Sequence, residues 1–362
     1  MIKVGIIGTN GVPAQYGGYE TLVENLLSFK KNKDIQYYIY CSGRRRGRSD
    51  TFKGARLIFI PLKANGMQAV LYDLISYLHA LKHTDLVLSL GTLAHLISPF
   101  TRLLTKKKVV TNLDGMDHKR EKWNIFAKGI ISSARYFAIR HSDAIIADNQ
   151  AVKKALYLAT KKSSELIEYG GDHDDYRNAD DAYTEYGLQK QGYFFKVCRI
   201  EPENNIALVL QAFSMLPKEK LVIVGNWESS RFGKEMRAQY GGLKNIFLLD
   251  PIYDTTKLNG LRAFCKAYIH GHSMGGTNPS LVEAMCLRLP VISFDNVFNR
   301  FTTENEAVFF KNHDELLSVI RNIEDDNLKR IADKMESIAE RRYKWNVIAA
   351  RYESLMLKTF EN

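Results

Sequence analysis

Cysteine is scarce in this sequence of 362 residues, and its spacing gives no sign of a metal site. The four cysteines, Cys41, Cys198, Cys265 and Cys286, form no CxxC pair. Zinc sites and disulfide frameworks are built from closely and regularly spaced cysteines. The pattern therefore predicts reduced thiols, as in a cytosolic protein, and no metal centre.

Long apolar runs are also missing. A helix that spans a bilayer needs about 18 or more consecutive apolar residues, whereas the longest runs here, such as LIFIPL and DLVLSL, are short. The N-terminal MIKVGIIG begins directly as a strand and lacks the basic, apolar and cleavage segments of a secretory leader. We therefore expect a cytoplasmic protein without membrane-spanning helices.

Positive charge is unevenly distributed. Residues 1–170 hold 26 Lys and Arg against 13 Asp and Glu, while the whole chain holds 51 and 40. The entire excess of positive charge thus lies in the first half, which predicts an anionic partner such as nucleic acid, phospholipid or a phosphorylated substrate. A basic surface that only keeps the protein soluble is the alternative. Because aromatic residues do not interleave with the basic runs RRRGR and KKK, a nucleic-acid interface ranks lower.

Short β-rich runs alternate with amphipathic stretches along the chain, and this alternation predicts doubly wound parallel sheets. The pattern weakens over the polar segment 168–191 and restarts at YFFKVCR. The length suits two domains. We therefore predict two Rossmann-like domains with a boundary near residue 170. In such domains ligands bind at the carboxyl edges of the strands.

The first loop, GTNGVPAQYGG, joins a strand to a helix. A dinucleotide fingerprint would need glycine at positions 8, 10 and 13, but the chain has Gly8, Asn10 and Pro13. The loop ends with Gly17 and Gly18 at a helix start, where free backbone amides favour a phosphate or a sugar hydroxyl. A simple turn is the alternative.

Asp114 follows the strand KKVVTNL directly. A carboxylate at the carboxyl edge of a strand can accept a proton or orient a hydroxyl, so Asp114 is our candidate for the catalytic base. The alternative is that Asp114 only forms a turn with Gly115.

The segment AYIHGHSMGGTNPSLVEAM carries the strongest signal. A strand ends at His270, and a helix begins near Asn278 with Pro279 in its first turn. The amides between these elements could hold a diphosphate. Glu283, in the second turn, could reach the same ligand, or it could close a capping box with Ser280. The candidate ligand-binding residues of this segment are Gly275, Gly276, Thr277, Asn278 and Glu283.

Arg199 ends the strand FFKVC, so it lies at the same edge of the second domain. An arginine there could stabilise the charge that develops on a diphosphate leaving group. A surface salt bridge is the alternative. The pattern Asp172-His173-Asp174 could bind a divalent metal with a nucleotide, but because it lies in the polar segment we do not predict a metal site there.

The segments GTNGVPAQYGGYETLVENL, VCRIEPENN and GGTNPSLVEAM together resemble the retaining GT-B glycosyltransferases of family four, and most closely their bacterial rhamnosyltransferase branch. The resemblance implies a GT-B architecture, in which two Rossmann-like domains face each other across a cleft. It implies an acceptor-binding domain over 1–170 that is completed by a C-terminal helix over about 346–362. The nucleotide-sugar-binding domain would cover 171–345.

The resemblance also implies residue roles. Arg199 corresponds to the arginine that contacts the donor diphosphate, and Glu283 to the glutamate that binds the nucleotide ribose. Gly17 and Gly18 correspond to a loop near the phosphates and the acceptor. The chain departs from the family at Gly275, where a first glutamate is expected, and at Asn204, where a lysine is usual. The resemblance also places Asp114 where the family usually has a histidine of the cleft.

The function implied is transfer of a sugar, L-rhamnose from dTDP-rhamnose, to a saccharide on a polyprenyl diphosphate, in capsular or cell-wall polysaccharide synthesis. Neither a cofactor nor a metal is implied. An epimerase of the same shape and a catalytically silent nucleotide-sugar-binding protein are the alternatives.

We further expect peripheral association with an anionic membrane surface. Apolar residues at 96, 97, 100, 103 and 104 directly precede Lys106, Lys107 and Lys108. Such a segment can rest on an anionic leaflet. The alternative is a buried helix face with solvated lysines at its end.

Overall fold

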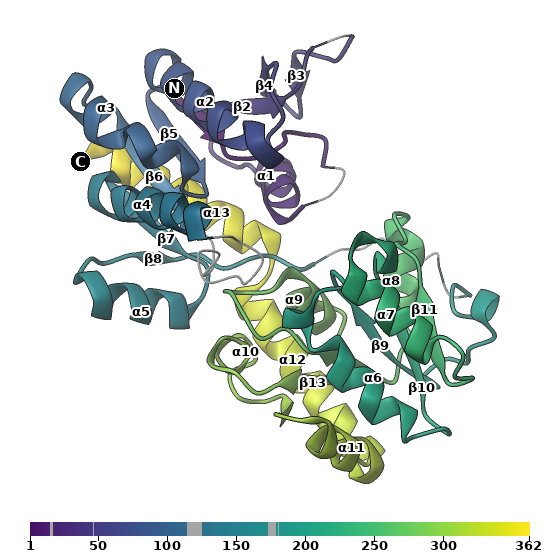
Figure 1. Ribbon diagram of the computed structural model, residues 1–362. Helices are drawn as coiled ribbons and strands as arrows, with labels where there is room; N and C mark the ends of the chain where they lie inside the picture. Colours follow the sequence, from purple (N-terminus) through teal and green to yellow (C-terminus); the bar gives the residue numbers. More distant parts are fainter. Residues whose placement is uncertain (15–16, 46, 114–124, 173–178, 180) are drawn as a thin grey trace. The chain divides into compact units, whose positions relative to one another are not determined.

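The chain folds into two α/β units, each built on its own largely parallel sheet, in the computed structural model (Figure 1). The structure describes residues 1–14, 17–45, 47–113, 125–172, 179 and 181–362. Unit 1 comprises Met1–Tyr169 and Trp345–Asn362, and unit 2 comprises Gly170–Lys344. The predicted alternation of strands and helices is confirmed in both units.

The sheet of unit 1 has the strand order β3-β4-β2-β1-β5-β6-β7-β8. Its described pairings are parallel except that of the short edge strand β3 with β4. The strands are β1 (Ile2–Ile7), β2 (Ile35–Ser42), β3 (Thr51–Phe52), β4 (Ala55–Ile60), β5 (Leu86–Leu90), β6 (Lys108–Asn112), β7 (Ala144–Ala147) and β8 (Glu165–Leu166). The helices are α1 (Gly18–Ser28), α2 (Ala69–His83), α3 (Ser98–Leu104), α4 (Ile125–His141), α5 (Gln150–Thr160) and α13 (Trp345–Glu361).

Both faces of this sheet are covered, which explains why its central strands β1 and β5 are largely apolar. Side chains alternate between the faces: Val4 and Ile6 of β1 pack in a cluster with α1 and α13, whereas Ile7 packs in a second cluster with α2. The tail helix α13 is thus part of unit 1, and Figure 1 shows it in yellow among the purple and blue elements. Trp345 and Tyr352 of α13 are almost fully buried in this core.

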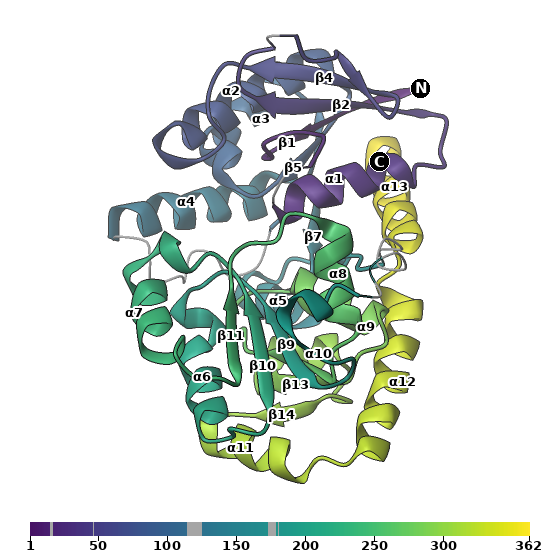
Figure 2. The same ribbon diagram turned by 90° about the vertical axis from the view of Figure 1, so that its right-hand side faces the viewer.

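Unit 2 has the strand order β11-β10-β9-β12-β13-β14, with all described pairings parallel (Figure 2). The strands are β9 (Tyr193–Val197), β10 (Lys220–Val224), β11 (Ile246–Leu249), β12 (Ala267–His270), β13 (Val291–Phe294) and β14 (Val308–Phe310). The helices are α6 (Ile206–Ser214), α7 (Arg231–Tyr240), α8 (Thr255–Ala263), α9 (Pro279–Cys286), α10 (Val297–Thr302), α11 (His313–Asn322) and α12 (Asp325–Arg342).

The segment 168–191, predicted to be a linker, contributes to the core of unit 2. Ala179, Ala182 and Leu188 are buried in the cluster that contains Phe195 and Tyr268. This segment is rich in polar and turn-forming residues, and the three buried apolar residues are scattered among them. The sequence therefore shows no strand or helix pattern here.

Among the described residues, no helix combines the length and the apolar character needed to cross a bilayer.

His95 is a buried titratable group in unit 1. It lies in the 3-10 helix η2 (Leu93–Ile97), its Nε2 is 2.9 Å from Thr111 Oγ1, and its Nδ1 has no hydrogen-bond partner among the described residues. Burial lowers the pKa of His95 to about 3. The native ring therefore stays neutral at acidic pH, whereas the unfolded chain protonates it below about pH 6.5.

We expect this difference to destabilise unit 1 as the pH falls from about 6.5 towards 3. The unfolded state binds the extra proton, so the free energy of unfolding should fall by about 1.4 kcal/mol per pH unit from this residue. Chemical denaturation at pH 7.5 and pH 5 checks this. His95→Gln should flatten the slope, whereas the exposed His83→Gln should not; equal slopes in His95→Gln and the wild type would contradict the assignment.

Candidate functional site

Two neighbouring strands of unit 2, β9 and β12, bring the predicted donor-binding segments to one edge of the sheet. β12 pairs with β9 in parallel, with Tyr268 opposite Phe195. Their carboxyl ends therefore point the same way. Arg199 follows β9, and the glycine-rich loop 271–278 follows β12 and leads into α9.

The loop ends at a well-formed helix start. Asn278 caps α9 through its side chain, which accepts a hydrogen bond from the Ser280 amide at 3.1 Å, and Pro279 occupies the first turn. Gly275 has φ of +103°, a conformation that L side chains rarely adopt. The glutamate that the family carries at this position could therefore not replace Gly275 without a change in the backbone.

Glu283 forms an ion pair instead of a capping box. Its Oε2 is 2.8 Å from Nη1 of Arg262, which lies on α8 and has a side chain only 3% exposed. Arg262 Nη1 also donates to Asn259 Oδ1 at 3.1 Å. The capping-box alternative is wrong, because Asn278 rather than Ser280 is the N-cap. Sequence reasoning did not find Arg262, which lies 21 residues before Glu283 on another helix.

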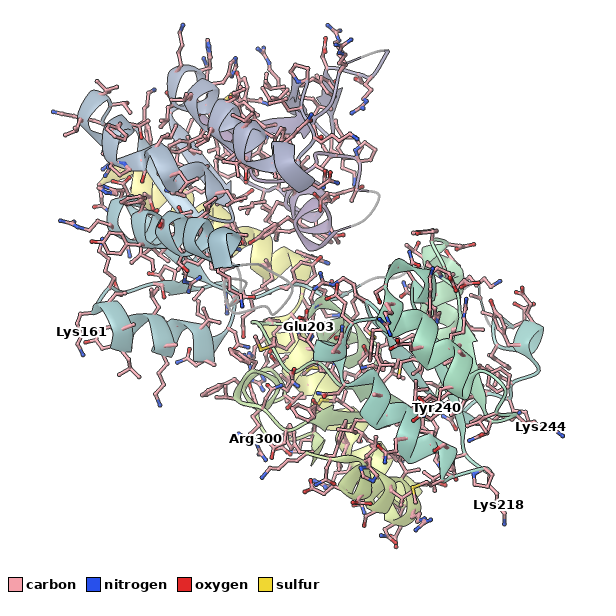
Figure 3. All side chains as sticks on the ribbon, viewed as in Figure 1. Lys161, Glu203, Lys218, Tyr240, Lys244 and Arg300 are labelled. Carbon is pink, nitrogen blue, oxygen red and sulfur yellow. The ribbon has the colours of Figure 1, made fainter. Side chains whose placement is uncertain are left out.

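Arg199 lies at the surface of this edge. Its side chain is 41% exposed, and its Nη2 is 3.7 Å from Glu203 Oε1 (Glu203 is labelled in Figure 3). An exposed pair of this length contributes little to stability. Arg199 thus does form the salt bridge given as the alternative. This salt bridge is weak, so the Arg199 guanidinium stays available to an anion.

Asn204, at the position of the family's lysine, is turned inward. It is 4% exposed, its Nδ2 donates to the Arg199 carbonyl at 2.8 Å, and its Oδ1 is 2.9 Å from His272 Nδ1. It therefore positions the loops around it rather than offering a charge to a ligand.

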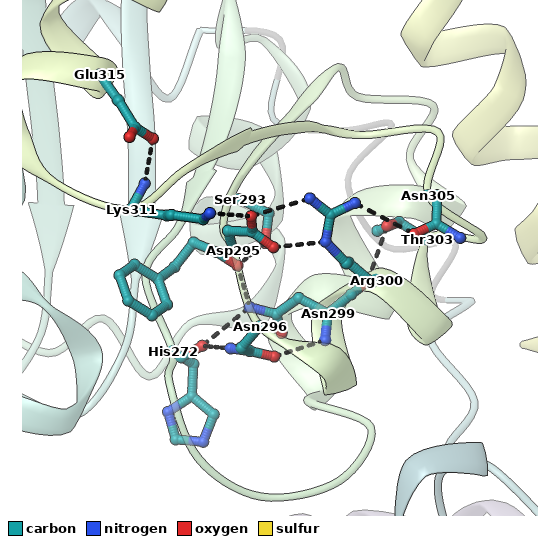
Figure 4. Close-up of polar contacts among 11 residues, drawn as sticks. His272, Ser293, Asp295, Asn296, Asn299, Arg300, Thr303, Asn305, Lys311 and Glu315 are labelled. Carbon is teal, nitrogen blue, oxygen red and sulfur yellow. Dashed lines mark hydrogen bonds and ion pairs between the residues drawn. The ribbon is translucent and has the colours of Figure 1, made fainter.

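The glycine-rich loop is also held from α10. The carbonyl oxygen of His272 accepts hydrogen bonds from the side-chain amides of Asn296, at 2.8 Å, and Asn299, at 2.9 Å (Figure 4). On the other side Ser273 donates to the Glu203 carbonyl through its amide and its hydroxyl. These contacts fix the loop before any ligand binds, which lowers the entropy lost on binding.

A buried lysine at this edge was missed by sequence reasoning. Lys196 of β9 is 1% exposed, and a Cβ added to Gly271 would lie 2.8 Å from its Nζ. Burial lowers its pKa, and burial followed by the charge of Lys196 holds the pKa of His270 well below the usual range. The signal available in the sequence was a lysine inside the apolar run YFFKV.

In unit 1 the first loop is organised by a carboxylate. Glu20 of α1, 6% exposed, accepts hydrogen bonds from Thr9 Oγ1 at 3.0 Å and from the Asn10 amide at 2.6 Å. Gly17 caps α1 with φ of +129°, and a Cβ there would overlap Glu20 Oε2. A carboxylate at this helix start repels phosphate and can accept hydrogen bonds from hydroxyls. Phosphate and a sugar hydroxyl are the two ligands predicted for Gly17 and Gly18. The negative charge of Glu20 favours the sugar hydroxyl.

Asp73 of α2 is a second titratable group that the sequence did not reveal. Burial raises its pKa to about 7, the range suited to a general acid or base. The adjacent Tyr72 donates to the Thr9 carbonyl at 2.8 Å, so this part of α2 contacts the first loop.

Two predicted features fall partly or wholly beyond the described residues, Asp114 and the pattern Asp172-His173-Asp174. Asp114 lies in the segment 114–124, and His173 and Asp174 lie in 173–178, all outside the described residues. In the part of the chain that the structure describes, no group of three His, Cys, Asp or Glu side chains is arranged to hold a metal ion.

The two units together have the fold of the GT-B glycosyltransferases. Sucrose-phosphate synthase from Thermosynechococcus elongatus superposes with a TM-score of 0.80 at 15% identity, over 100% of both chains. HepE from Anabaena in complex with UDP gives 0.77 at 15% identity, over 99% of this chain and 100% of that one. A glycosyltransferase from Rickettsia africae gives 0.73 at 15% identity, over 99% and 98%.

Family models divide the chain in the same place as the structure. Residues 184–345 match the model described as Glycosyl transferases group 1, so unit 2 carries a glycosyltransferase group 1 domain. Residues 1–172 match a domain of unknown function, DUF1972. No curated protein matches the sequence.

Proposed function

We propose that this chain transfers L-rhamnose from dTDP-rhamnose, with retention of configuration, to a saccharide on a polyprenyl diphosphate during bacterial capsular or cell-wall polysaccharide synthesis. The observation that carries the proposal is the gathering of Arg199, the glycine-rich loop and Glu283 at adjacent strand ends of a glycosyltransferase group 1 domain. The structures of HepE with UDP and UDP-glucose support a nucleotide-sugar donor.

Each residue of unit 2 has a chemical task in this proposal. The Arg199 guanidinium and the amides at the start of α9 stabilise the diphosphate as the glycosidic bond to it breaks. Gly275, Gly276 and Thr277 let the backbone approach the donor closely. Glu283, oriented by Arg262, accepts hydrogen bonds from the nucleotide ribose.

Unit 1 takes the acceptor in this proposal. Its first loop, with Gly17 and Gly18 beside Glu20, presents a surface suited to sugar hydroxyls. Asp114 is proposed as the group that orients or deprotonates the acceptor hydroxyl.

A panel of nucleotide-sugars tests the function. Thermal shift with dTDP-rhamnose, UDP-glucose and GDP-mannose should identify the donor, and transfer to a lipid-linked saccharide should follow with that donor. The anomeric configuration of the product decides between retention and inversion. Donor isomerisation without transfer would instead indicate an epimerase, and donor binding without either reaction a binding protein.

We also propose that unit 1 rests on an anionic membrane surface through an apolar patch on α2 and α3. Six large apolar side chains of these helices are exposed, three of them by more than 65% of their surface. They are Leu71, Ile75, Leu78, Phe100, Leu103 and Leu104. We call this set the α2–α3 patch.

The structure corrects two parts of the sequence prediction for this surface. Leu96 and Ile97 are half-buried, and Ile97 packs against the core. Lys107 pairs with Asp85 at 3.4 Å, and Lys108 is 3.7 Å from Asp143, so two of the three lysines already have partners. The apolar side chains therefore contribute more to the proposed docking than the lysine run does.

We expect Leu103→Ser with Leu104→Ser to weaken binding to phosphatidylglycerol vesicles about tenfold or more, because both leucines are 85% exposed and would leave the bilayer interface. Co-sedimentation measures this. Tyr157→Ser with Leu158→Ser, an exposed pair on α5 of the same unit, is the matched control and should bind normally. Equal binding by both double variants would contradict the proposal.

A further inference from the structure

A polar cavity lies at the amino-terminal edge of the sheet of unit 1, opposite the edge where ligands of such sheets bind. Its volume is about 540 Å³, and it is lined by the residues that lead into β6, β7 and β8 and by the last turns of α13. The carboxyl edge carries the first loop of the proposed acceptor site, so this cavity is separate from that loop.

Lysines dominate the charge of the lining. The lining contains four lysines, Lys108, Lys161, Lys162 and Lys358, and two carboxylate side chains, those of Asp143 and of the exposed Glu165. One of these carboxylates, Asp143, is already neutralised.

The Asp143 carboxylate accepts two hydrogen bonds from the Arg102 guanidinium, at 3.1 and 2.8 Å, and one from the Val109 amide at 2.8 Å. It is also 3.7 Å from Lys108 Nζ. Asp143 therefore has no charge left to offer the other lysines.

Lys162 is the least compensated of these cations. Its Nζ donates to the Arg140 carbonyl at 3.2 Å and pairs with no carboxylate among the described residues. Burial and the neighbouring Arg140 and Arg102 lower its pKa. Lys161, labelled in Figure 3 at the end of α5, and Lys358 likewise have no acidic partner in the described structure. An anion placed among them would relieve this repulsion.

A hydroxyl in the lining also lacks a partner. Ser164 is 7% exposed, and its Oγ is buried without a hydrogen bond to any described residue. Buried hydroxyls are nearly always paired, so an unpaired one beside a lysine cluster indicates a missing acceptor. The unpaired Ser164 hydroxyl is an observation separate from the lysine charges, because it concerns a missing hydrogen bond.

We propose that this cavity binds a phosphate-bearing anion, held by Lys162 and Lys358 and by the Ser164 hydroxyl. A phosphate offers several acceptor oxygens and a charge close to −2, which matches three lysines without a carboxylate partner in the described structure and one hydroxyl without a hydrogen bond. The phosphate could belong to a soluble metabolite or to a lipid headgroup. The proposal does not depend on the sugar-transfer reaction.

Titration of the full-length Arg199→Ala variant with inorganic pyrophosphate, followed by calorimetry, tests the soluble source, because that variant weakens the diphosphate site proposed in unit 2. Lys162→Ala with Lys358→Ala should weaken binding about tenfold or more. Lys218→Ala with Lys244→Ala removes the same charge from exposed lysines of unit 2, both labelled in Figure 3, and should bind normally. If both double variants lose pyrophosphate affinity equally, only the net charge matters, and the proposal is overturned.

Ser164→Ala separates binding from folding. Removing an unpaired buried hydroxyl should leave the melting temperature equal or higher without ligand, and should reduce the shift caused by pyrophosphate. A lowered melting temperature with an unchanged pyrophosphate shift would overturn the role of Ser164 and the proposal with it.

Vesicles test the lipid source. In the Leu103→Ser, Leu104→Ser background, which removes the α2–α3 patch contact, residual binding to phosphatidylglycerol but not phosphatidylcholine vesicles should be lost on Lys162→Ala with Lys358→Ala. If the lysine substitutions abolish vesicle binding and the chain does not bind pyrophosphate, the ligand is a lipid headgroup. If the chain binds pyrophosphate and the lysine substitutions leave vesicle binding unchanged, the ligand is a soluble phosphate. Absence of both overturns the site.

Discussion

Replacing Arg199 with alanine should lower the rate of sugar transfer by about a hundredfold to a thousandfold, the usual effect of removing a group that stabilises charge developing in the transition state. The melting temperature should not change. Arg199 is 41% exposed and its 3.7 Å contact with Glu203 is longer than a hydrogen bond, so its loss removes only a weak ion pair. Single-turnover kinetics with the preferred donor, together with thermal unfolding, measure both effects.

Arg231→Ala provides the matched control. Arg231 pairs with Glu235 four residues later, the same spacing as Arg199 with Glu203, and is exposed on the same unit. It should transfer sugar at the normal rate. Arg199→Lys keeps the charge but loses the two-pronged geometry, so we expect partial activity. Normal transfer by Arg199→Ala would rule out the leaving-group role.

Replacing Glu283 with alanine should reduce both donor affinity and stability. The loss of a hydrogen bond to the ribose predicts a donor affinity about tenfold to a hundredfold lower. The same change leaves the buried Arg262 guanidinium without its carboxylate, which destabilises a protein by about 3 kcal/mol or more. Calorimetry with the donor and chemical denaturation measure the two losses separately.

A second substitution separates the loss of donor affinity from the loss of stability. Glu283→Ala with Arg262→Met removes both partners of the ion pair, so much of the stability should return, while donor affinity should stay low. Recovery of donor affinity in this double variant would show that Glu283 acts only through Arg262. Unchanged stability in Glu283→Ala would contradict the ion pair itself.

The fold was predictable because parallel sheets covered on both faces are made of short, largely apolar strands. Runs such as KVGIIG and KLVIVG differ sharply from the amphipathic helices between them, and the capped start of α9 at Asn278 and Pro279 is a local signal. The two-residue strands β3 and β8 lie at the sheet edges and have no such pattern.

The site was predictable only where residues follow a strand end. Arg199 and the glycine-rich loop were found in this way, but the partner of Glu283 comes from a helix distant in sequence. The pairing of Lys107 and Lys108 with Asp85 and Asp143 was within reach: both aspartates directly precede strands that flank β6, so the amino ends of three parallel strands meet there.

The position of α13 in unit 1 has a consequence for the order of events during protein synthesis. The first 169 residues leave the ribosome early, but the core they form is incomplete until Trp345, Ile348 and Tyr352 arrive. Unit 2 is continuous in sequence, so its own core needs no residue from α13. The half of the protein that is translated first therefore depends for its core on residues that are translated after the whole of unit 2.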